Sequence, residues 1–226
     1  KLTKKTPGTL NIVKDNIVSH VKLTPANVEK EYDGTTYTAG EATAVDDNGN
    51  PVKVEYSVDG NTWTTDPRTI TATDVADSKE SIQVRASVEG YEGFVNGTQT
   101  LKITKRKVAV VGGGWTEAQP YTGTAYEKTD YTFENVAPNQ TATITYNLSG
   151  IAVGEYTGTF GEDFAVTAAD GTKVTANYEL TTKTPGILKI EKIDIGENVT
   201  LTTKPVVKTY DGTTYYAGVA TAVDNN

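Results

Sequence analysis

Hydrophobic and polar residues alternate along many short segments of the chain. The alternation is clearest at residues 52–58, 82–86, 101–103, 141–146 and 188–190, where every second side chain is apolar. Successive side chains of a β-strand point to opposite faces, so this period of two indicates half-buried strands. Few segments carry the i, i+3, i+4, i+7 apolar spacing of an amphipathic helix. The pattern therefore predicts an all-β protein.

Turn signals separate the alternating segments. Asn-Gly or Asp-Gly pairs stand between extended runs at residues 48–49, 59–60 and 170–171. Such pairs tolerate the positive φ angles that tight hairpin turns require. Threonine, with about 40 residues, and the 13 tyrosines add side chains that fit a pleated surface. Both observations strengthen the all-β prediction.

One stretch of sequence occurs twice. Residues 1–48 and 179–226 align without a gap at a shift of 178 residues, and 29 of the 48 aligned positions are identical. The sequence Tyr-Asp-Gly-Thr-Thr-Tyr stands at 32–37 in the first copy and at 210–215 in the second. Leu-x-Ile strand endings at 10–12, 101–103 and 188–190 give a weaker half-period. The chain is therefore predicted to alternate two module types of about 90 residues each.

Basic patches after each Leu-x-Ile ending suggest where the modules meet. We expect one module at residues 15–106 and a second at residues 107–192. Residues 1–14 would be the last strand of a truncated preceding module, and residues 193–226 the start of a truncated third one. The modules are expected to be small β-sandwiches of an Ig-like kind, or β-grasp-like domains, joined end to end. Incomplete modules bury little apolar surface, so the ends should pack on whole modules or on a neighbouring molecule.

Aromatic and β-branched side chains must fill these small cores. The predicted core of the first module is Tyr32, Tyr56, Trp63, Val84 and Leu101, and that of the second is Trp115, Tyr121, Phe133, Tyr146, Phe160 and Phe164. The repeated motif is predicted to be structural, and it comprises Tyr32, Asp33 and Gly34 in one copy and Tyr210, Asp211 and Gly212 in the other. In this interpretation Asp-Gly makes a turn, the Asp33 carboxylate accepts backbone N–H groups, and Tyr32 and Tyr37 anchor its ends.

With this motif, the chain resembles the YDG-type and MBG-type repeats of large bacterial surface proteins. Residues 54–64 are similar to the hairpin of the first type, and residues 177–180 followed by 184–190 are similar to the ending of the second. The second module departs from the Tyr-Asp-Gly form, because Tyr-Thr-Gly stands at 121–123. The resemblance implies tandem stalks or adhesive regions of secreted or wall-anchored proteins, often from Gram-positive bacteria. It implies no catalytic residues.

Composition excludes several function classes. The chain has 21 Lys+Arg against 29 Asp+Glu, a net charge of −8, and lacks the basic face that a nucleic-acid binder needs. It contains no Cys, no Met and one His, which excludes disulfides, thiolate chemistry, Cys-based zinc sites and His-centred triads. The longest apolar run, at residues 107–111, is too short for membrane insertion. We expect no cofactor and no enzymatic activity.

Exposed aromatic rings are the candidate ligand contacts. Sugar rings stack on flat side chains, so Trp63, Tyr91, Phe94 and Trp115 could contact a host or plant glycan or a mucin. Packing in the core is the competing interpretation of each Trp.

Three other segments favour a structural interpretation. Residues 46–50 are rich in oxygen ligands but lack the later bidentate acid of a calcium loop, so a hairpin turn is expected there. The acids Glu155, Glu162 and Asp163 cluster in the sequence, and we interpret them as solvated charge rather than a glycosidase pair. Residues 112–114, a Gly run, lack the spacing of a phosphate loop and are expected to form a flexible turn or bulge.

The sequence thus predicts a non-catalytic tandem-repeat region of a secreted or cell-wall-anchored bacterial protein. It would act as a stalk, spacer or adhesin scaffold, with adjacent repeats of the same chain as its neighbours. Two alternatives stay open. One is a carbohydrate- or mucin-binding module, and the other is an accessory module of a large secreted enzyme.

Overall fold

The computed structural model describes residues 8–224, apart from the side chains of Glu197 and Asn198. It is an all-β protein, as the alternation predicts. Its helical parts are α1 (Ile195–Asn198) and the 3-10 turns η1 (Ile17–Ser19), η2 (Pro67–Thr69), η3 (Val75–Asp77) and η4 (Thr175–Asn177). Among the described residues, no helix is long and apolar enough to cross a membrane.

Most strands are short. Those before residue 105 are β1 (Asp15–Asn16), β2 (Val21–Thr24), β3 (Val28–Glu31), β4 (Tyr37–Thr38), β5 (Thr43–Asp46), β6 (Val54–Ser57), β7 (Thr71–Ala72), β8 (Lys79–Ala86), β9 (Tyr91–Glu92) and β10 (Val95–Thr104). Those after it are β11 (Arg106–Gly112), β12 (Gln119–Pro120), β13 (Tyr126–Lys128), β14 (Tyr131–Glu134), β15 (Gln140–Thr143), β16 (Tyr146–Gly150), β17 (Gly154–Thr157), β18 (Thr159–Phe160), β19 (Ala165–Ala168), β20 (Tyr178–Thr184), β21 (Ile187–Glu191), β22 (Val199–Thr202) and β23 (Thr221–Asp224).

The chain divides into two compact units. Of the described residues, unit 1 contains 8–108 together with Asn135–Thr141 and Val166–Glu179. Unit 2 contains Ala109–Glu134, Ala142–Ala165 and residues 180–224. The change after Val108 is close to the expected limit at residue 106, but two later segments return to unit 1. The division into modules at 15–106 and 107–192 therefore stays a prediction.

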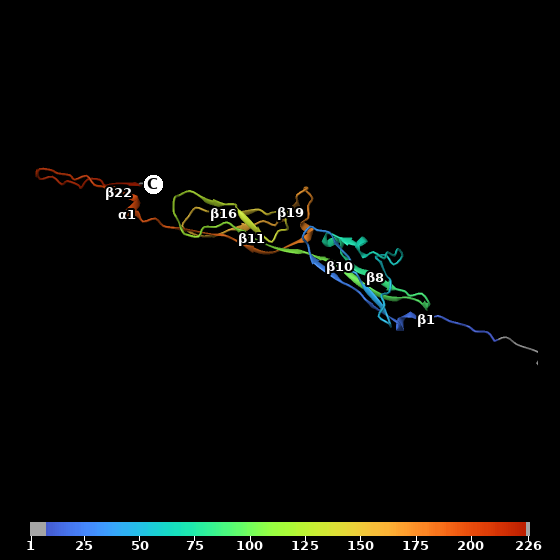
Figure 1. Ribbon diagram of the computed structural model, residues 1–226. Coiled ribbons are helices and arrows are strands. Elements are labelled where there is room, and N and C mark those ends of the chain that lie inside the picture. Colours follow the sequence, from blue (N-terminus) through green and yellow to red (C-terminus); the bar gives the residue numbers. More distant parts are fainter. Residues whose placement is uncertain (1–7, 225–226) are drawn as a thin grey trace, which may run out of the picture. The chain divides into compact units, whose positions relative to one another are not determined.

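Unit 1 is built on a four-stranded sheet with the order β3-β10-β8-β6. β8 and β10 run side by side in antiparallel register (Figure 1), and β3 joins the other edge of β10 in parallel. β2 and β5 form a separate two-stranded antiparallel sheet, with β3 and β4 between them in the chain, and we call this long loop and its two paired ends the hairpin. Its buried Val21 and Ala44 pack with Ile17 and Ala86. Alternation explains this core, because every second residue of β8 from Ile82 to Ala86 is buried.

The returning segments of unit 1 complete the packing around Tyr32. This side chain is 2% exposed and meets the Tyr178 ring edge to face at a centroid distance of 5.4 Å. The amide of Gln140 donates to the Tyr32 hydroxyl at 3.1 Å and accepts from the Tyr178 hydroxyl at 2.8 Å. Arg106 donates to the Tyr32 carbonyl at 3.2 Å. The first tyrosine of the repeated motif is thus a fully buried, hydrogen-bonded anchor.

Unit 2 packs around Tyr146, which sits among glycines. Its hydroxyl donates to the Gly113 carbonyl at 2.7 Å and accepts from the Gly186 N–H at 3.0 Å. A Cβ on Gly112 or Gly158 would lie within 2.4 Å of a Tyr146 ring or hydroxyl atom. Of the expected flexible turn or bulge at residues 112–114, Gly112 instead belongs to strand β11, and its absent side chain makes room for the buried Tyr146 ring.

The predicted core residues fall into three groups. Tyr32, Tyr56, Val84, Leu101 and Tyr146 are buried, as predicted. Partly buried side chains belong to Trp63, Trp115, Phe133, Phe160 and Phe164. The prediction for Tyr121 is wrong, because it follows the short edge strand β12 and is 40% exposed. Aliphatic Leu148, Leu188 and Ile190 fill the centre of unit 2 with Tyr146 instead.

The two copies of the repeated sequence can be compared directly. We call residues 21–46 the N-terminal copy and residues 199–224 the C-terminal copy. β22 pairs with β23 in the register of β2 with β5, since Val21 faces Asp46 and Val199 faces Asp224. In Figure 1 the C-terminal copy is the red hairpin that begins at β22. The hairpin is therefore encoded locally, within the repeated sequence itself.

Candidate functional site

The candidate ligand surface in unit 1 is a cluster of two aromatic rings around an arginine. The Arg85 guanidinium lies over the Trp63 ring at 3.8 Å from its centroid and over the Phe94 ring at 4.4 Å. Arg85 Nε also donates to Glu55 Oε2 at 2.9 Å. We call these four residues, Glu55, Trp63, Arg85 and Phe94, the aromatic cluster.

Strand register and one turn assemble the aromatic cluster. Arg85 of β8 faces Glu55 of β6 directly in the antiparallel ladder. After β6 the chain turns at Gly60, whose φ is +74°, while the Asp59 carboxylate accepts the N–H groups of Asn61 and Thr62. These bonds hold the pKa of Asp59 far below its ordinary value, because they favour its charged form. The turn returns Trp63 to the side of β6, as the Asp-Gly signal predicts.

The charges of the aromatic cluster are balanced. Glu55 accepts from Lys53 at 3.0 Å as well as from Arg85, and these two cations, Lys53 first, lower its pKa. A cation over an aromatic face contributes about 0.5–1 kcal/mol at an exposed site. Arg85 thereby covers one face of each ring. Phe94 is nevertheless 41% exposed, so part of the cluster is open to solvent.

The other two aromatic candidates lie elsewhere. Tyr91 stacks against the ring of His20 at a centroid distance of 4.9 Å. Trp115, in unit 2, meets the Tyr126 ring edge to face and carries the Lys128 ammonium at 4.8 Å from its centroid. The structure thus brings Trp63 and Phe94 together and places Tyr91 and Trp115 in separate clusters.

Sequence reasoning missed the environment of the single histidine. His20 Nδ1 lies 2.6 Å from Asp47 and Nε2 lies 3.0 Å from Asp15. Hydrogen bonds to Asp47 and then to Asp15 raise the pKa of His20 above its ordinary value of 6.5, because both favour the imidazolium. The histidine thereby links the start of the module to the tip of the β5 turn. No spacing in the sequence indicated this pairing.

Three of the acids considered for metal or catalytic roles accept hydrogen bonds or form an ion pair. Asp46 accepts from the N–H groups of Asn48 and Asn50 at 2.9 and 2.8 Å, which confirms the hairpin interpretation. Asp163 accepts from the N–H and hydroxyl of Thr145, and Glu162 forms an ion pair with Lys183. No group of three or more potential metal-ligating side chains occurs in the part of the chain that the structure describes.

The repeated motif also has a structural role, and the same bonds form in both copies. Asp33 accepts from the Thr35 N–H at 2.8 Å, the Thr35 hydroxyl at 2.7 Å and the Tyr37 hydroxyl at 2.6 Å. Asp211 accepts from the corresponding N–H and hydroxyl of Thr213 and from the Tyr215 hydroxyl. Gly34 and Gly212 have φ values of +84° and +81°, which favour glycine. The carboxylate therefore closes the turn that was predicted.

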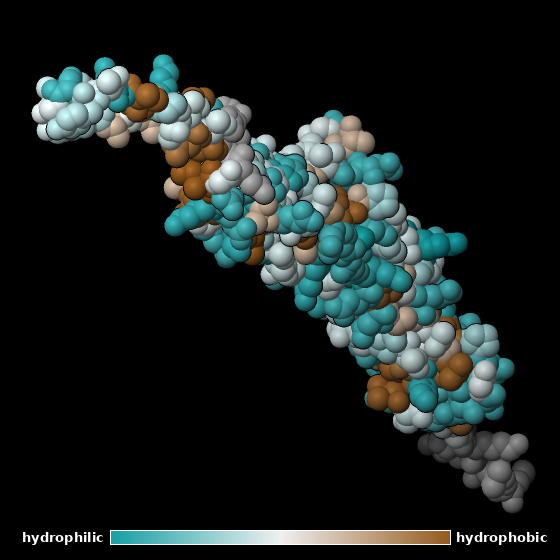
Figure 2. All heavy atoms as spheres, turned by 90° about the vertical axis from the view of Figure 1, so that its left-hand side faces the viewer, coloured by the Kyte–Doolittle hydropathy of each residue, from teal (hydrophilic) through white to brown (hydrophobic). Residues whose placement is uncertain are grey.

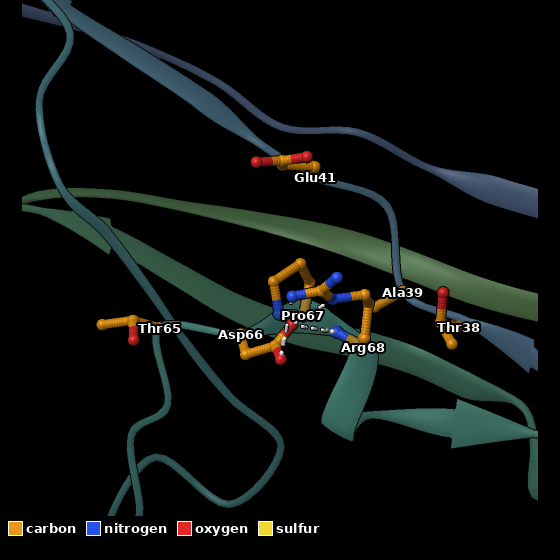
Figure 3. A pocket seen from close by; sticks show the side chains of 7 residues that line it. All are labelled: Thr38, Ala39, Glu41, Thr65, Asp66, Pro67 and Arg68. Carbon is orange, nitrogen blue, oxygen red and sulfur yellow. Dashed lines mark hydrogen bonds and ion pairs between the residues drawn. The ribbon is translucent and has the colours of Figure 1, made fainter.

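A cleft of about 570 Å³ lies beside η2 and is lined by Thr38, Ala39, Glu41, Thr65, Asp66, Pro67 and Arg68 (Figure 3). Arg68 Nε donates to Asp66 at 2.9 Å, and Asp66 also accepts the Arg68 N–H at 3.1 Å as the cap of η2. Hydrogen bonding to Arg68 lowers the pKa of Asp66. The facing charges thus stabilise the turn itself.

On the face seen in Figure 2, hydrophobic residues form small groups among hydrophilic ones. Comparison of the chain with known protein families, with curated proteins and with solved structures finds no match. The arguments for a function therefore rest on the repeat and on the geometry described above.

Proposed function

We propose that this chain is a non-catalytic, tandem-repeat region of a secreted or cell-surface bacterial protein, which acts as a stalk, spacer or adhesin scaffold. One observation carries the proposal. The repeated sequence returns after 178 residues with the same hairpin register and the same Asp-centred turn. Because the repeated sequence forms the same local structure in both copies, the chain is suited to arrange similar units in series.

The state of the carboxylates supports a non-catalytic role. A general acid at neutral pH needs a raised pKa, which burial or a neighbouring negative charge would provide. Among the described residues, each carboxylate with a resolved shift has a lowered pKa, and these are Asp15, Asp33, Asp46, Glu55, Asp59, Asp66, Asp77, Asp163, Asp170 and Asp211. These acids serve as charged hydrogen-bond acceptors in turns and ion pairs.

Small-angle X-ray scattering tests the spacer proposal. We would compare this chain with a longer one that carries one further 178-residue period in phase. For a linear array the radius of gyration should rise about 1.8-fold, in proportion to length, whereas a compact protein would give a rise of only about 1.2-fold. A compact rise would overturn the proposal. Circular dichroism of both chains would verify that the added period is folded.

The second candidate function is glycan binding by the aromatic cluster. It is favoured by the 41% exposure of Phe94 next to Trp63. A glycan array should then give hits that Phe94→Ala and Trp63→Ala each weaken by about tenfold or more, since aromatic anchors dominate such contacts. Tyr121→Ala is the matched control, because it removes an exposed ring of unit 2. Array binding that both cluster variants retain would reject this candidate.

A further inference from the structure

The C-terminal copy exposes a surface that the N-terminal copy buries. Tyr210 is 92% exposed, while its counterpart Tyr32 is 2% exposed. Leu201 is 66% exposed, while its counterpart Leu23 is partly buried against a hydrophobic cluster. Because the two hairpins share one register, the difference arises from what packs against each of them.

In the N-terminal copy strand β10 covers the edge of β3, while Gln140 and Tyr178 cover Tyr32. β3 pairs with β10 in parallel, so that Val28 faces Leu101 and Lys30 faces Ile103. The Tyr32 N–H continues this ladder by donating to the Thr104 carbonyl at 2.9 Å. In the C-terminal copy, the corresponding residues 206–209 form no strand.

One buried side chain of β10 recognises the backbone of the N-terminal copy at two points. Gln99 is 1% exposed, accepts from the Ala26 N–H at 3.0 Å and donates to the Gly40 carbonyl at 2.8 Å. Both partners are main-chain groups, so the recognition does not depend on the side chains that differ between the copies.

The C-terminal copy keeps the backbone geometry that Gln99 recognises. Gly40 passes so close to Ala26 that a Cβ on it would lie 2.3 Å from the Ala26 carbonyl oxygen. Its counterpart Gly218 makes the same approach to Lys204, with a corresponding distance of 2.5 Å. The two main-chain positions that the glutamine bridges are therefore brought together in both copies.

The charges along the pairing edge differ between the copies. In the N-terminal copy Glu29 pairs with Lys102 at 3.2 Å and Glu31 pairs with Arg106 at 3.5 Å. Val207 and Thr209 stand at these two positions in the C-terminal copy. A strand that pairs there meets uncharged Val207 and Thr209 in place of the two glutamates, with Lys208 between them as Lys30 is in the N-terminal copy.

We propose that the C-terminal copy is an acceptor site for a β-strand with the pattern Gln-x-Leu-x-Ile, which pairs in parallel with residues 206–209. Its partner is a polypeptide that carries the second half of this repeat, with an uncharged residue at the position of Lys102. This goes beyond the proposed spacer role, because it specifies a partner and a mode of pairing. Main-chain bonds supply affinity in such strand addition, and the alternate side chains supply specificity.

The test uses the full chain and a fluorescent peptide of residues 79–106, which contains β8 and β10. Hydrogen exchange followed by mass spectrometry should show at least tenfold slower exchange at residues 206–210 when the peptide is bound. A peptide with Leu101→Lys and Ile103→Lys should bind at least tenfold more weakly, because the register would place one lysine opposite Val206 and the other opposite Lys208. Gln99→Ala should weaken binding by about tenfold, since two main-chain groups lose their partner.

A charge exchange tests the specificity. Lys102→Val in the peptide should strengthen binding to the wild-type chain by several-fold. A chain with Val207→Glu restores the carboxylate found at Glu29, and it should prefer the Lys102 peptide over the Lys102→Val peptide. The same preference for both chains would overturn the assigned register.

Three further outcomes would overturn the proposal. One is the absence of slower exchange at residues 206–210 at a peptide concentration of about 1 mM, where even weak pairing is populated. Another is slower exchange confined to residues 28–31, which would mean that the peptide enters unit 1. The third is protection of residues 206–210 without peptide in a concentration-dependent dimer, which would assign the site to a second copy of this chain.

Discussion

The N-terminal and C-terminal copies share most of their sequence, yet Tyr32 of the first is buried and its counterpart Tyr210 is exposed. Both form the same hairpin and the same turn, whose partners all lie within the repeated sequence. They differ at β3 and β4, which pair with β10 and β7 in the N-terminal copy. The C-terminal counterparts, residues 206–209 and 215–216, form no strand. Contacts that are local in sequence thus form in both copies, while those with distant partners form in one.

A second pair of copies shows the same contrast. In β21, which β17 and β12 flank, Leu188 and Ile190 are 0% and 1% exposed, because they pack with Tyr146 and Leu148. The counterparts Leu10 and Ile12 are 86% and 83% exposed. Identical residues are therefore expected to contribute different amounts to the free energy of unfolding, depending on whether other strands pack around them. Substitutions at matched positions should separate these contributions.

The largest difference is expected between Tyr32→Ala and Tyr210→Ala. Truncation of a buried aromatic side chain leaves a cavity, and here it also removes the partner of Gln140, so unit 1 should lose about 3–5 kcal/mol. Tyr210→Ala should change stability by less than about 0.5 kcal/mol, because the side chain is exposed. Urea unfolding followed by Trp63 fluorescence in a Trp115→Phe background measures the effect of Tyr32→Ala on unit 1, and Trp115 fluorescence in a Trp63→Phe background measures the effect of Tyr210→Ala on unit 2. Equal effects of the two substitutions would contradict the comparison.

Leu188→Ala against Leu10→Ala tests the second pair of copies. The loss of a fully buried leucine should cost unit 2 about 2–5 kcal/mol, while the exposed Leu10 should be replaceable without measurable cost. Trp115 fluorescence in a Trp63→Phe background measures the effect of Leu188→Ala on unit 2, and Trp63 fluorescence in a Trp115→Phe background measures the effect of Leu10→Ala on unit 1. A destabilising Leu10→Ala would show that residues 9–13 pack against something in solution.

These contrasts also show what the sequence could predict. Alternation and Asp-Gly pairs predicted the strands and turns, because both depend on neighbouring residues, and they predicted the burial of Tyr56 and Leu101 for the same reason. The pairing of β3 with β10, the approach of Tyr178 to Tyr32 and the seat of Tyr146 among glycines depend on residues far apart in the chain. A pattern of neighbouring residues does not predict contacts between residues that are far apart in the sequence.

In the candidate site, too, the local features were predicted and the contacts between distant residues were not. The aromatic residues were chosen by type, and the turn predicted at residues 59–60 forms, with the Asp59 carboxylate as its acceptor. The guanidinium of Arg85 between Trp63 and Phe94 depends on the register of β8 with β6 and was not predicted. The ion pairs of His20 with Asp15 and Asp47 were missed because no two of these residues share a sequence motif.

The turn of the repeated motif offers a smaller contrast. Asp33→Ala removes three hydrogen bonds in a packed unit and should cost about 1–2 kcal/mol, whereas Asp211→Ala should affect only the local hairpin.

The hydrogen bond from Tyr37 lowers the pKa of Asp33. The contribution of Asp33 to the stability of unit 1 is therefore present above the ordinary pKa of 3.8 and is lost as the pH falls through the lowered pKa of the folded state. Urea unfolding at pH 7 and pH 3 measures this. The Asp33→Ala variant should show a weaker loss of stability in acid, and an unchanged acid dependence would contradict the assigned role.

The smallest effect is expected at His20, where the copies differ in sequence, because Asn198 stands at the corresponding position. The hydrogen bonds to Asp47 and Asp15 raise the pKa of His20, so its stabilising contribution is fully present below the ordinary value of 6.5. This contribution should be lost as the pH rises through the raised pKa of His20 in the folded state.

His20→Asn should therefore leave unit 1 with nearly the same stability at pH 6 and pH 8, whereas the wild-type chain should be slightly more stable at pH 6. Because these groups are solvent-accessible, about 0.5 M salt should reduce the wild-type difference. A pH dependence that survives in the variant would mean that another group titrates, and that the histidine does not link the module start to the β5 turn.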